Sequence, residues 1–314
     1  MAYTNTDTNM TTSSALSAGM QTYYNRELLR TFEPNPVHLQ FGDEHRMPPH
    51  SGLVMNMRKL IPLETNTKAL SEGDPGESVM LAETEVTVQL QQYGEYARCT
   101  DKLDLTHLDM DIMRRTKLFG DAGARSIDAV VREELAKCAN VIYAGGKASR
   151  AELTAADKLP SRELRKAVKT LKKNHAQTFG GYFVAIIGPD TMYDLQEDEA
   201  FVKVSQYQDK ENIYTGEVGR LFGVRLVETT EAKIFEGAGA SGADVASVIV
   251  LGQYAYGVTS LKGAKPRVIV KPAGSAGTAD PLDQISTVGW KMDGFGAKLL
   301  QPEYAVRIEC GFSA

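Results

Sequence analysis

The glycine-rich segment 237–242, Gly-Ala-Gly-Ala-Ser-Gly, is the pattern with the most specific chemical meaning in this sequence. Its G-x-G-x-x-G spacing, when it lies between a strand and a helix, places backbone N–H groups and a helix N-terminus around a pyrophosphate. The residues that follow, 243–251, are β-branched and strand-like, so that no helix is available to hold the anion. We therefore interpret the segment as a flexible loop and predict no cofactor.

Two further groups of side chains have the chemistry of metal ligands. Four aspartates lie close together in the chain: Asp101, Asp104, Asp109 and Asp111. They do not form the Asp-x-Asp-x-Asp-Gly loop of a calcium site. The histidines have neither H-x-x-x-H nor H-x-H spacing, and the chain contains no G-x-S-x-G elbow and no P-loop lysine. We therefore predict no metal site and no catalytic residue, and we expect that the protein is not an enzyme.

A run of basic residues is the remaining candidate for a binding site. Its members are Arg162, Arg165, Lys166, Lys169, Lys172 and Lys173. They lie on one face of a predicted helix without interleaved aromatic side chains, whereas single-stranded nucleic acids are usually bound by basic and aromatic groups together. We interpret this face as solvated or as a contact between subunits.

The composition of the whole chain argues against several further classes of protein. Its 314 residues include 35 Lys and Arg against 40 Asp and Glu, a net charge of -5. This balance argues against a protein that holds nucleic acid by neutralising phosphates. No apolar run approaches the roughly 18 residues of a membrane span, and residues 1–14 lack the features of a signal peptide. Cys99, Cys138 and Cys310 are widely spaced and odd in number, which favours reduced thiols.

The N-terminal third of the sequence predicts extended elements with little core of their own. Residues 1–12 are polar and aperiodic, typical of a disordered arm, and a helix that carries Tyr23 and Tyr24 would follow. Alternating apolar residues predict strands over 52–63 and 86–96, joined by a polar tip rich in Gly and Pro. Such a ribbon would be roughly 30–40 Å long, and an isolated hairpin is marginal in water. The ribbon therefore needs a partner surface.

The rest of the chain predicts a long helix and a smaller mixed region. Apolar residues at helical spacing predict a helix over 106–144, which begins at a capping-box-like Thr-x-x-Asp and would span roughly 50 Å. Strands and helices then alternate: helices near 161–171 and 190–195, and strands near 182–187, 223–229 and 245–251. Strands within 267–270, 284–292 and 297–309 complete an α+β chain of about two domains.

Several segments in this order carry a family resemblance. They are Leu70-Ser71-Glu72-Gly73-Asp74-Pro75, Thr87-Val88-Gln89-Leu90-Gln91-Gln92-Tyr93-Gly94-Glu95-Tyr96, Thr100-Asp101-Lys102-Leu103-Asp104-Leu105-Thr106, Gly216-Glu217-Val218-Gly219-Arg220-Leu221-Phe222-Gly223-Val224-Arg225 and Val288-Gly289-Trp290-Lys291. Together with the order of the elements, they resemble the major capsid (coat) proteins of tailed bacteriophages, which have the HK97-type fold. The resemblance runs from about residue 15 to the C-terminus.

This resemblance implies a division of the chain into four parts. Residues 1–45 would form an N-terminal arm, and residues 46–99 an extended β-hairpin loop, the E-loop, that lies across a neighbouring subunit. Residues 100–146 together with 263–314 would form a peripheral domain with the long spine helix and a β-sheet. Residues 147–262 would form a compact α/β axial domain at the symmetry axes.

The resemblance also implies a function and a set of partners. The chain would assemble with itself into hexamers and pentamers that form an icosahedral head around double-stranded DNA, which it would contact only weakly. A separate scaffolding protein, a portal and a possible decoration protein would be further partners, with no membrane involved. The protein would be located in the virion and assembled in the host cytoplasm.

Five residues are candidates for contacts between subunits. They are Lys68, Glu72 and Asp74 at the ribbon tip, and Tyr23 and Tyr24 in the arm. Some members of the fold form Lys–Asn crosslinks, but a single lysine in a polar tip is normally solvated, so we expect none at Lys68. Two alternative functions remain: the shell protein of an encapsulin-type bacterial nanocompartment, and a soluble α/β enzyme that binds a nucleotide at residues 237–242.

Overall fold

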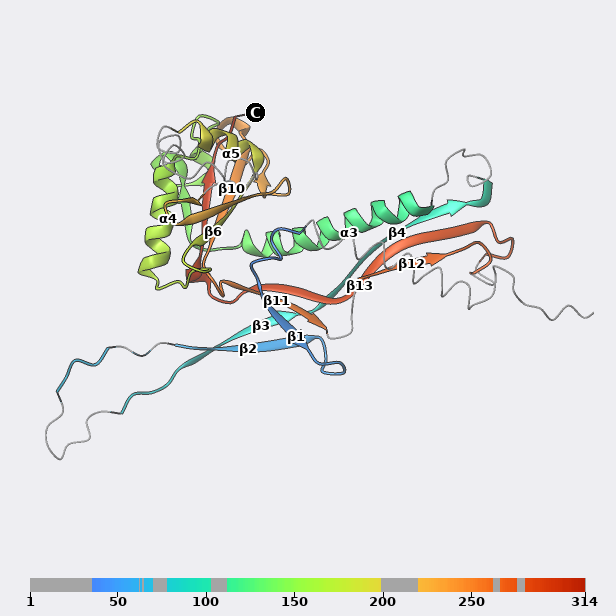
Figure 1. Cartoon of the computed structure of the whole chain (residues 1–314), viewed down its shortest axis with the longest axis horizontal. Coiled ribbons are helices and arrows are strands. Elements are labelled where there is room, and N and C mark those ends of the chain that lie inside the picture. Colours follow the sequence, from blue (N-terminus) through green and yellow to red (C-terminus); the bar gives the residue numbers. More distant parts are fainter. Residues whose placement is uncertain are drawn as a thin grey trace, which may run out of the picture.

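The molecule is elongated, with a compact body at one end, a long helix lying on a sheet, and a two-stranded ribbon that projects from the middle (Figure 1). The computed structural model describes residues 36–61, 63, 65–69, 78–102, 112–198, 220–261, 266–275 and 280–313. The main elements in chain order are β1 (Asp43–Met47), β2 (Val54–Leu60), β3 (Glu83–Gln89), β4 (Gln91–Thr100), α3 (Ile112–Leu135), β5 (Val141–Tyr143), α4 (Ser161–Lys173), β6 (Phe183–Ile187), α5 (Pro189–Gln196), β7 (Arg220–Leu221), β8 (Val224–Glu228), β9 (Ile234–Phe235), β10 (Val245–Leu251), β11 (Tyr256–Leu261), β12 (Arg267–Lys271), β13 (Ile285–Leu299) and β14 (Ala305–Cys310). Short 3-10 turns, η1 (Ala144–Gly146), η2 (Arg150–Glu152), η3 (Ala240–Gly242) and η5 (Pro302–Tyr304), connect some of them.

The compact body is built on a seven-stranded sheet with the order β5-β14-β10-β6-β8-β7, to which β9 adds beside β10. Strands β6 and β10 lie in its centre, and every residue of both is buried. Their continuous apolar sequences suit this position, because a strand covered on both faces has no side facing water. Helix α4 packs on one face through Leu164, Val168 and Leu171.

The elongated part consists of a five-stranded sheet with α3 along it. The strand order is β1-β11-β13-β12. Strands β11 and β12 pair with different parts of one edge of the long strand β13, and β4 pairs with its opposite edge. Ile127 and Val131 of α3 pack against Val288 and Trp290 of β13 in one apolar cluster. This helix therefore covers one face of the sheet and leaves the opposite face open.

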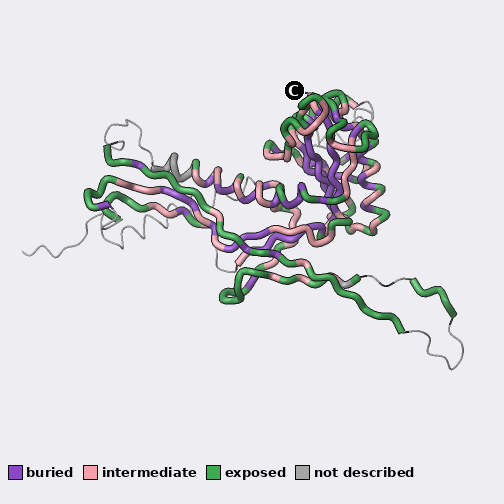
Figure 2. The backbone as a smooth tube through the Cα atoms, turned by 180° about the vertical axis from the view of Figure 1, so that it is seen from behind, coloured by how far each residue is buried: buried purple, intermediate pink, exposed green. Residues whose placement is uncertain are grey.

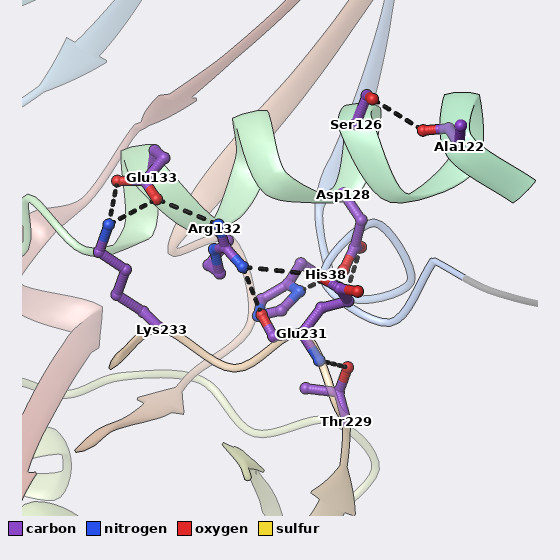
Figure 3. A network of polar contacts seen from close by, with 9 residues as sticks. All are labelled: His38, Ala122, Ser126, Asp128, Arg132, Glu133, Thr229, Glu231 and Lys233. Carbon is purple, nitrogen blue, oxygen red and sulfur yellow. Dashed lines mark hydrogen bonds and ion pairs between the residues drawn. The ribbon is translucent and has the colours of Figure 1, made fainter. Parts of the chain in front are cut away.

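Polar contacts fix the position of α3 along its length (Figure 3). The carboxylate of Asp128 accepts a hydrogen bond from the backbone N–H of His38 at 2.8 Å and lies 2.5 Å from His38 Nδ1. Further along the helix, Lys233 Nζ lies 2.7 Å from the Glu133 carboxylate. These contacts connect the start of the described chain and the 229–233 loop to the same helix.

The ribbon is a separate two-stranded sheet of β2 and β3, paired antiparallel from Val54 opposite Gln89 to Leu60 opposite Glu83. Most of the residues in its two strands are exposed (Figure 2). The predicted ribbon is therefore confirmed, but its expected return strand is divided. After Leu90 the chain continues as β4, which pairs with β13 instead of β2.

The predicted helix over 106–144 is wrong at its C-terminal end. Helix α3 ends at Leu135, and Val141–Tyr143 forms β5, which pairs in parallel with β14. The apolar residues at 138, 141 and 142 have a spacing that fits a helix or a strand, and pairing with a distant strand decides between them. Residues 103–111, where this helix was expected to begin, lie outside the described residues.

The two larger sheets also combine strands from different parts of the expected division of the chain, as β5 of the expected peripheral unit already shows. Strand β14, expected in the peripheral unit of residues 263–314, pairs with β10 in the seven-stranded sheet. Strand β11, expected in the axial unit of residues 147–262, pairs with β13 in the five-stranded sheet. A central strand needs hydrogen-bond partners on both edges, and β14 supplies the second edge of β10 after β6 has paired with the first.

Candidate functional site

Exposed apolar side chains are concentrated on the ribbon and its two outer segments. They are Leu53, Val54, Ile61, Leu63, Val79, Met80 and Leu81. Met80 is 91% exposed, which is unusual for a residue of this type. Because exposed apolar patches mark surfaces that bind a partner, the ribbon is the first candidate site.

An ion pair holds the ribbon against the body near the outer end of strand β2. Lys59 Nζ of β2 lies 2.8 Å from Oε2 of Glu303, which belongs to the short turn η5. The hydrogen bond from Lys59 lowers the pKa of the Glu303 carboxyl. The backbone carbonyl of Glu303 accepts a second hydrogen bond, from the Asn174 side chain at 2.9 Å. These groups line a crevice of about 680 Å³ between the ribbon and the body.

A second concave surface lies on the sheet face that α3 leaves open. Its volume is about 640 Å³, and its lining includes residues of β4, β12 and β13. Tyr96 is 61% exposed there, and the guanidinium of Arg98 lies 5.6 Å from the centre of its ring. Lys271 and Lys291 also line this surface, which we call the sheet groove.

Only one of the five candidate contact residues lies in the described part of the chain. Lys68 is exposed, and its backbone N–H donates to the Asn66 side chain at 2.9 Å. Glu72, Asp74, Tyr23 and Tyr24 lie outside the described residues. Their roles therefore stay predictions.

The glycine-rich segment has a structural explanation. Its backbone N–H groups bond within the chain, from Gly239 to the Ala243 carbonyl at 2.8 Å and from Ala240 to the Leu153 carbonyl at 2.7 Å. A side chain at position 239 would lie 2.6 Å from the Leu153 oxygen, which explains the glycine there. Strand β10 follows the segment, so no helix N-terminus faces a ligand.

The metal-ligand and cysteine residues considered in the sequence do not form a ligand-binding cluster in the described part of the chain. Among the described residues, no three His, Cys, Asp or Glu side chains are placed to hold a metal ion. All three cysteines are buried and free. The basic run lies on α4, where Arg162, Arg165, Lys169 and Lys172 form the exposed face. In the described part of the chain, no helix is long and apolar enough to cross a membrane.

Sequence reasoning missed the sheet groove and the Lys59–Glu303 pair. Both join residues that are far apart in the chain, and periodicity within one segment carries no information about them. One local signal pointed to the groove: Gly94 and Gly289 lie inside strands, where glycine often marks a close approach of another group.

Comparisons with known proteins identify the family. A family model described as "Phage capsid protein" matches residues 83–308, and no curated protein matches. Among solved structures, the capsid of Ralstonia phage GP4 is 14% identical with a TM-score of 0.67, and the match covers 87% of this chain and 88% of that one. The capsid of Cyanophage P-SCSP1u is 14% identical with a TM-score of 0.64, covering 88% and 89%.

A further match among solved structures has a lower TM-score. A virus-like particle from Pyrococcus furiosus is 12% identical with a TM-score of 0.53, and the match covers 92% of this chain and 99% of that one. At these identities the structural matches show the fold alone. They place the chain among the HK97-type α+β folds, as expected from the sequence.

Proposed function

Since this chain belongs to the phage capsid protein family and is a major capsid protein of a tailed phage, we propose that it builds the head from hexamers and pentamers around double-stranded DNA. The ribbon is the observation that carries the proposal. Its apolar side chains, such as Met80 and Leu81, are exposed, and the ribbon projects away from both sheet cores (Figure 1). A second copy of the chain would cover them, and burial of apolar surface is the main favourable contribution to association.

The two sheets support an assignment of domains. We assign α3 and the five-stranded sheet to the peripheral domain, and the seven-stranded sheet with α4 and α5 to the axial domain. The ribbon, within residues 46–99, is the extended loop, and the part of residues 1–45 that precedes β1 is the arm. Strands β5 and β14 then belong to the axial domain and β11 to the peripheral domain, which amends the boundaries expected from the sequence.

The remaining partners follow from the same role. As a capsid component the protein belongs to the virion, and we propose that assembly occurs in the host cytoplasm with a separate scaffolding protein, a portal and a decoration protein. DNA would be contacted weakly, because the chain carries a net charge of -5. The role is structural, not catalytic. Neither alternative is favoured, because the matching family is one of phage capsids and residues 237–242 lead into a strand.

Shortening of the ribbon tests this function. The wild-type protein should form closed shells that are visible by electron microscopy and have a high mass by light scattering. Deletion of residues 68–79 should leave the far-UV circular dichroism and the main unfolding transition nearly unchanged, because both sheets lie elsewhere. The same deletion should abolish shells or make them fragile. Normal heat-stable shells from the shortened chain would show that residues 68–79 are not an assembly contact.

A further inference from the structure

The outer side of α4 carries positive charges and no negative one. Six cations at spacings of three and four residues fall on one side of this helix. They are Arg162, Arg165, Lys166, Lys169, Lys172 and Lys173, which we call the basic face. Leu164 and Leu171 on the other side are buried in the core of the compact body. The helix runs along the outer side of the body, so the basic face is open to a partner (Figure 1).

The single acid of α4 neutralises only the first part of this face. Glu163 is buried, and its carboxylate lies 2.7 Å from Lys166 Nζ and 3.9 Å from Arg162 Nε. In the part of the chain that the structure describes, no carboxylate forms an ion pair with Lys169, Lys172 or Lys173. The second half of the helix therefore carries cations without neutralising partners.

Arg165 adds a guanidinium to this group of free cations. It lies 4.9 Å from the centre of the Phe222 ring, which belongs to the turn between β7 and β8. Stacking on an aromatic ring holds a guanidinium in position and leaves its N–H groups available to an anion. Together with the three lysines, Arg165 makes four cations that are ready for an anionic partner.

This charge pattern is unfavourable in the isolated subunit. Like charges three and four residues apart repel each other and destabilise a helix, and a surface that is merely solvated usually mixes both signs. The helix dipole favours Lys172 and Lys173 in the last turn, but it does not favour Arg165 and Lys169 in the middle of the helix. A partner with several closely spaced negative charges would remove the repulsion.

The described surface of the body offers no such row of acids in a second copy. Its exposed acids include Asp190, Glu228 and Glu236, which come from α5, β8 and the loop after β9. Double-stranded DNA, in contrast, carries one negative charge for about every 1.7 Å of its axis. Arg165 and Lys173 are eight residues apart, about 12 Å along the helix. A phosphate backbone can therefore contact all four free cations at once.

We propose that the basic face of α4 binds the phosphate backbone of double-stranded DNA and therefore lies on the inner wall of the shell. The proposal rests on the proposed function and adds to it the surface that touches DNA. The sequence alone favoured a solvated face or a contact between subunits, and the structure adds the missing carboxylate partners. With about four phosphates for each copy and no contact to bases, the binding is weak and independent of DNA sequence.

The salt dependence of DNA binding tests this contact. Fluorescence anisotropy of a labelled duplex of about 20 base pairs, titrated with the unassembled full-length chain, gives the binding constant between about 50 and 200 mM NaCl. Four neutralised phosphates predict a slope of about −3.6 for log K against log salt. The variant Lys169→Gln with Lys172→Gln and Lys173→Gln, the α4 variant, should bring this slope to about −0.9 and lower the affinity at low salt by roughly tenfold or more.

Two controls separate position from net charge. The groove variant, Arg98→Gln with Lys271→Gln and Lys291→Gln, loses the same charge from the sheet groove and should keep the wild-type slope. Replacement of the three α4 lysines by arginine preserves the charge and should keep the slope as well. Gln and Arg are both good helix formers, so α4 should persist in these variants, which circular dichroism checks.

Shells test the location of the basic face. Closed wild-type shells should not bind the added duplex, because DNA outside cannot reach the inner wall, whereas the unassembled chain should bind it. The α4 variant should still form normal shells by electron microscopy, because its basic face contacts DNA and not a second subunit. Added duplex bound by closed wild-type shells, and released by the α4 variant, would place the face outside and overturn the inner-wall location.

The remaining outcomes separate the contact from the function. Wild-type protein without shells would overturn the proposed function, whereas the slopes judge the DNA contact by themselves. Equal slopes for the wild type and the α4 variant, or a slope lost only in the groove variant, would overturn the DNA contact. A folded α4 variant that forms no shells would assign the face to a contact between subunits and overturn the proposal too. If the α4 variant does not fold, Lys172→Gln with Lys173→Gln replaces it, with an expected slope change of about 1.8.

Discussion

The Nζ atom of Lys59 lies 2.8 Å from the Oε2 atom of Glu303, which connects the outer end of strand β2 in the ribbon to a turn 244 residues later in the chain. Glu303 also accepts a hydrogen bond from Asn174 at the end of α4 through its backbone carbonyl. The pair thus bridges the ribbon, a turn beside β14 and the helix of the body. Its position suggests that it sets the angle at which the ribbon leaves the subunit.

The first prediction concerns this angle. Lys59→Met should change the free energy of unfolding by at most about 1 kcal/mol, because partly exposed ion pairs contribute little. It should nevertheless broaden the range of ribbon angles, so that electron micrographs show shells of mixed size or irregular shape. Arg58→Met is the matched control, because the pair of Arg58 with Glu83 at 3.9 Å lies within the ribbon. Uniform shells of normal size from Lys59→Met would show that the Lys59–Glu303 ion pair does not set the angle of the ribbon.

The second prediction uses the pH dependence of thiol ionisation. Burial raises the pKa of the Cys310 thiol to about 12, whereas an exposed thiol has a pKa of about 8.5. Because the thiolate is the reactive form, iodoacetamide should not label Cys310 in the folded protein between pH 7 and about 9. The stability that comes from the neutral buried thiol is fully present below the unfolded pKa and is lost as pH rises toward the folded one.

Mass spectrometry of labelled peptides checks this expectation. Unfolding in urea should expose Cys310 and make its labelling rise through the ordinary thiol range, which serves as the internal control. Rapid labelling of Cys310 in folded protein at pH 8 would mean that the C-terminal strand opens readily.

The ribbon and the central strands were predictable because their signals are local. Alternation of apolar residues identified β2 and β3, and the continuous apolar sequence of residues 182–187 identified β6 as a strand buried on both faces. The end of α3 was not predictable in this way. Cys138 and Ile142 have a spacing that fits either element, and only the pairing of β5 with β14, more than 160 residues later, made the segment a strand.

The sheet groove could not be derived from the sequence for a similar reason. Tyr96, Ile269 and Gly289 come together through the register of three strands, and nothing near any one of them in the chain predicts the other two. Periodicity indicates which side chains share a face of one strand, but it does not identify the neighbouring strand. The polar tip of the ribbon, in contrast, is one continuous segment of the sequence and was predictable from it.

The third prediction concerns the buried contact between His38 and Asp128. Asp128→Ala removes the acceptor for the His38 backbone N–H and for its ring, and both groups are buried. Unfilled buried donors cost about 1–3 kcal/mol each, so the urea midpoint should fall clearly. Asp121→Ala, which removes a carboxylate from the same helix, is the control and should have a smaller effect. Equal midpoints for the two variants would contradict a specific role of the His38 contact.

The last prediction concerns the fully buried carboxylate of Glu309 in β14. It accepts two hydrogen bonds from Arg150, each at 2.7 Å, and lies 2.8 Å from Nε of Arg307. Arg150 is partly exposed and can turn toward water, but Arg307 is only 8% exposed and cannot. Glu309→Gln therefore leaves a buried guanidinium without its anion, and breaking such a pair costs about 3–5 kcal/mol.

Equilibrium unfolding in urea measures this loss on the ribbon-shortened chain, if that chain stays unassembled as expected. Arg150→Gln is the matched comparison and should cost less, because Arg307 continues to neutralise Glu309 after that change. A loss below about 1 kcal/mol for Glu309→Gln would mean that water reaches Arg307 in solution. The order of the two variants is decisive, since a contact dominated by the exposed arginine would make Arg150→Gln the more damaging change.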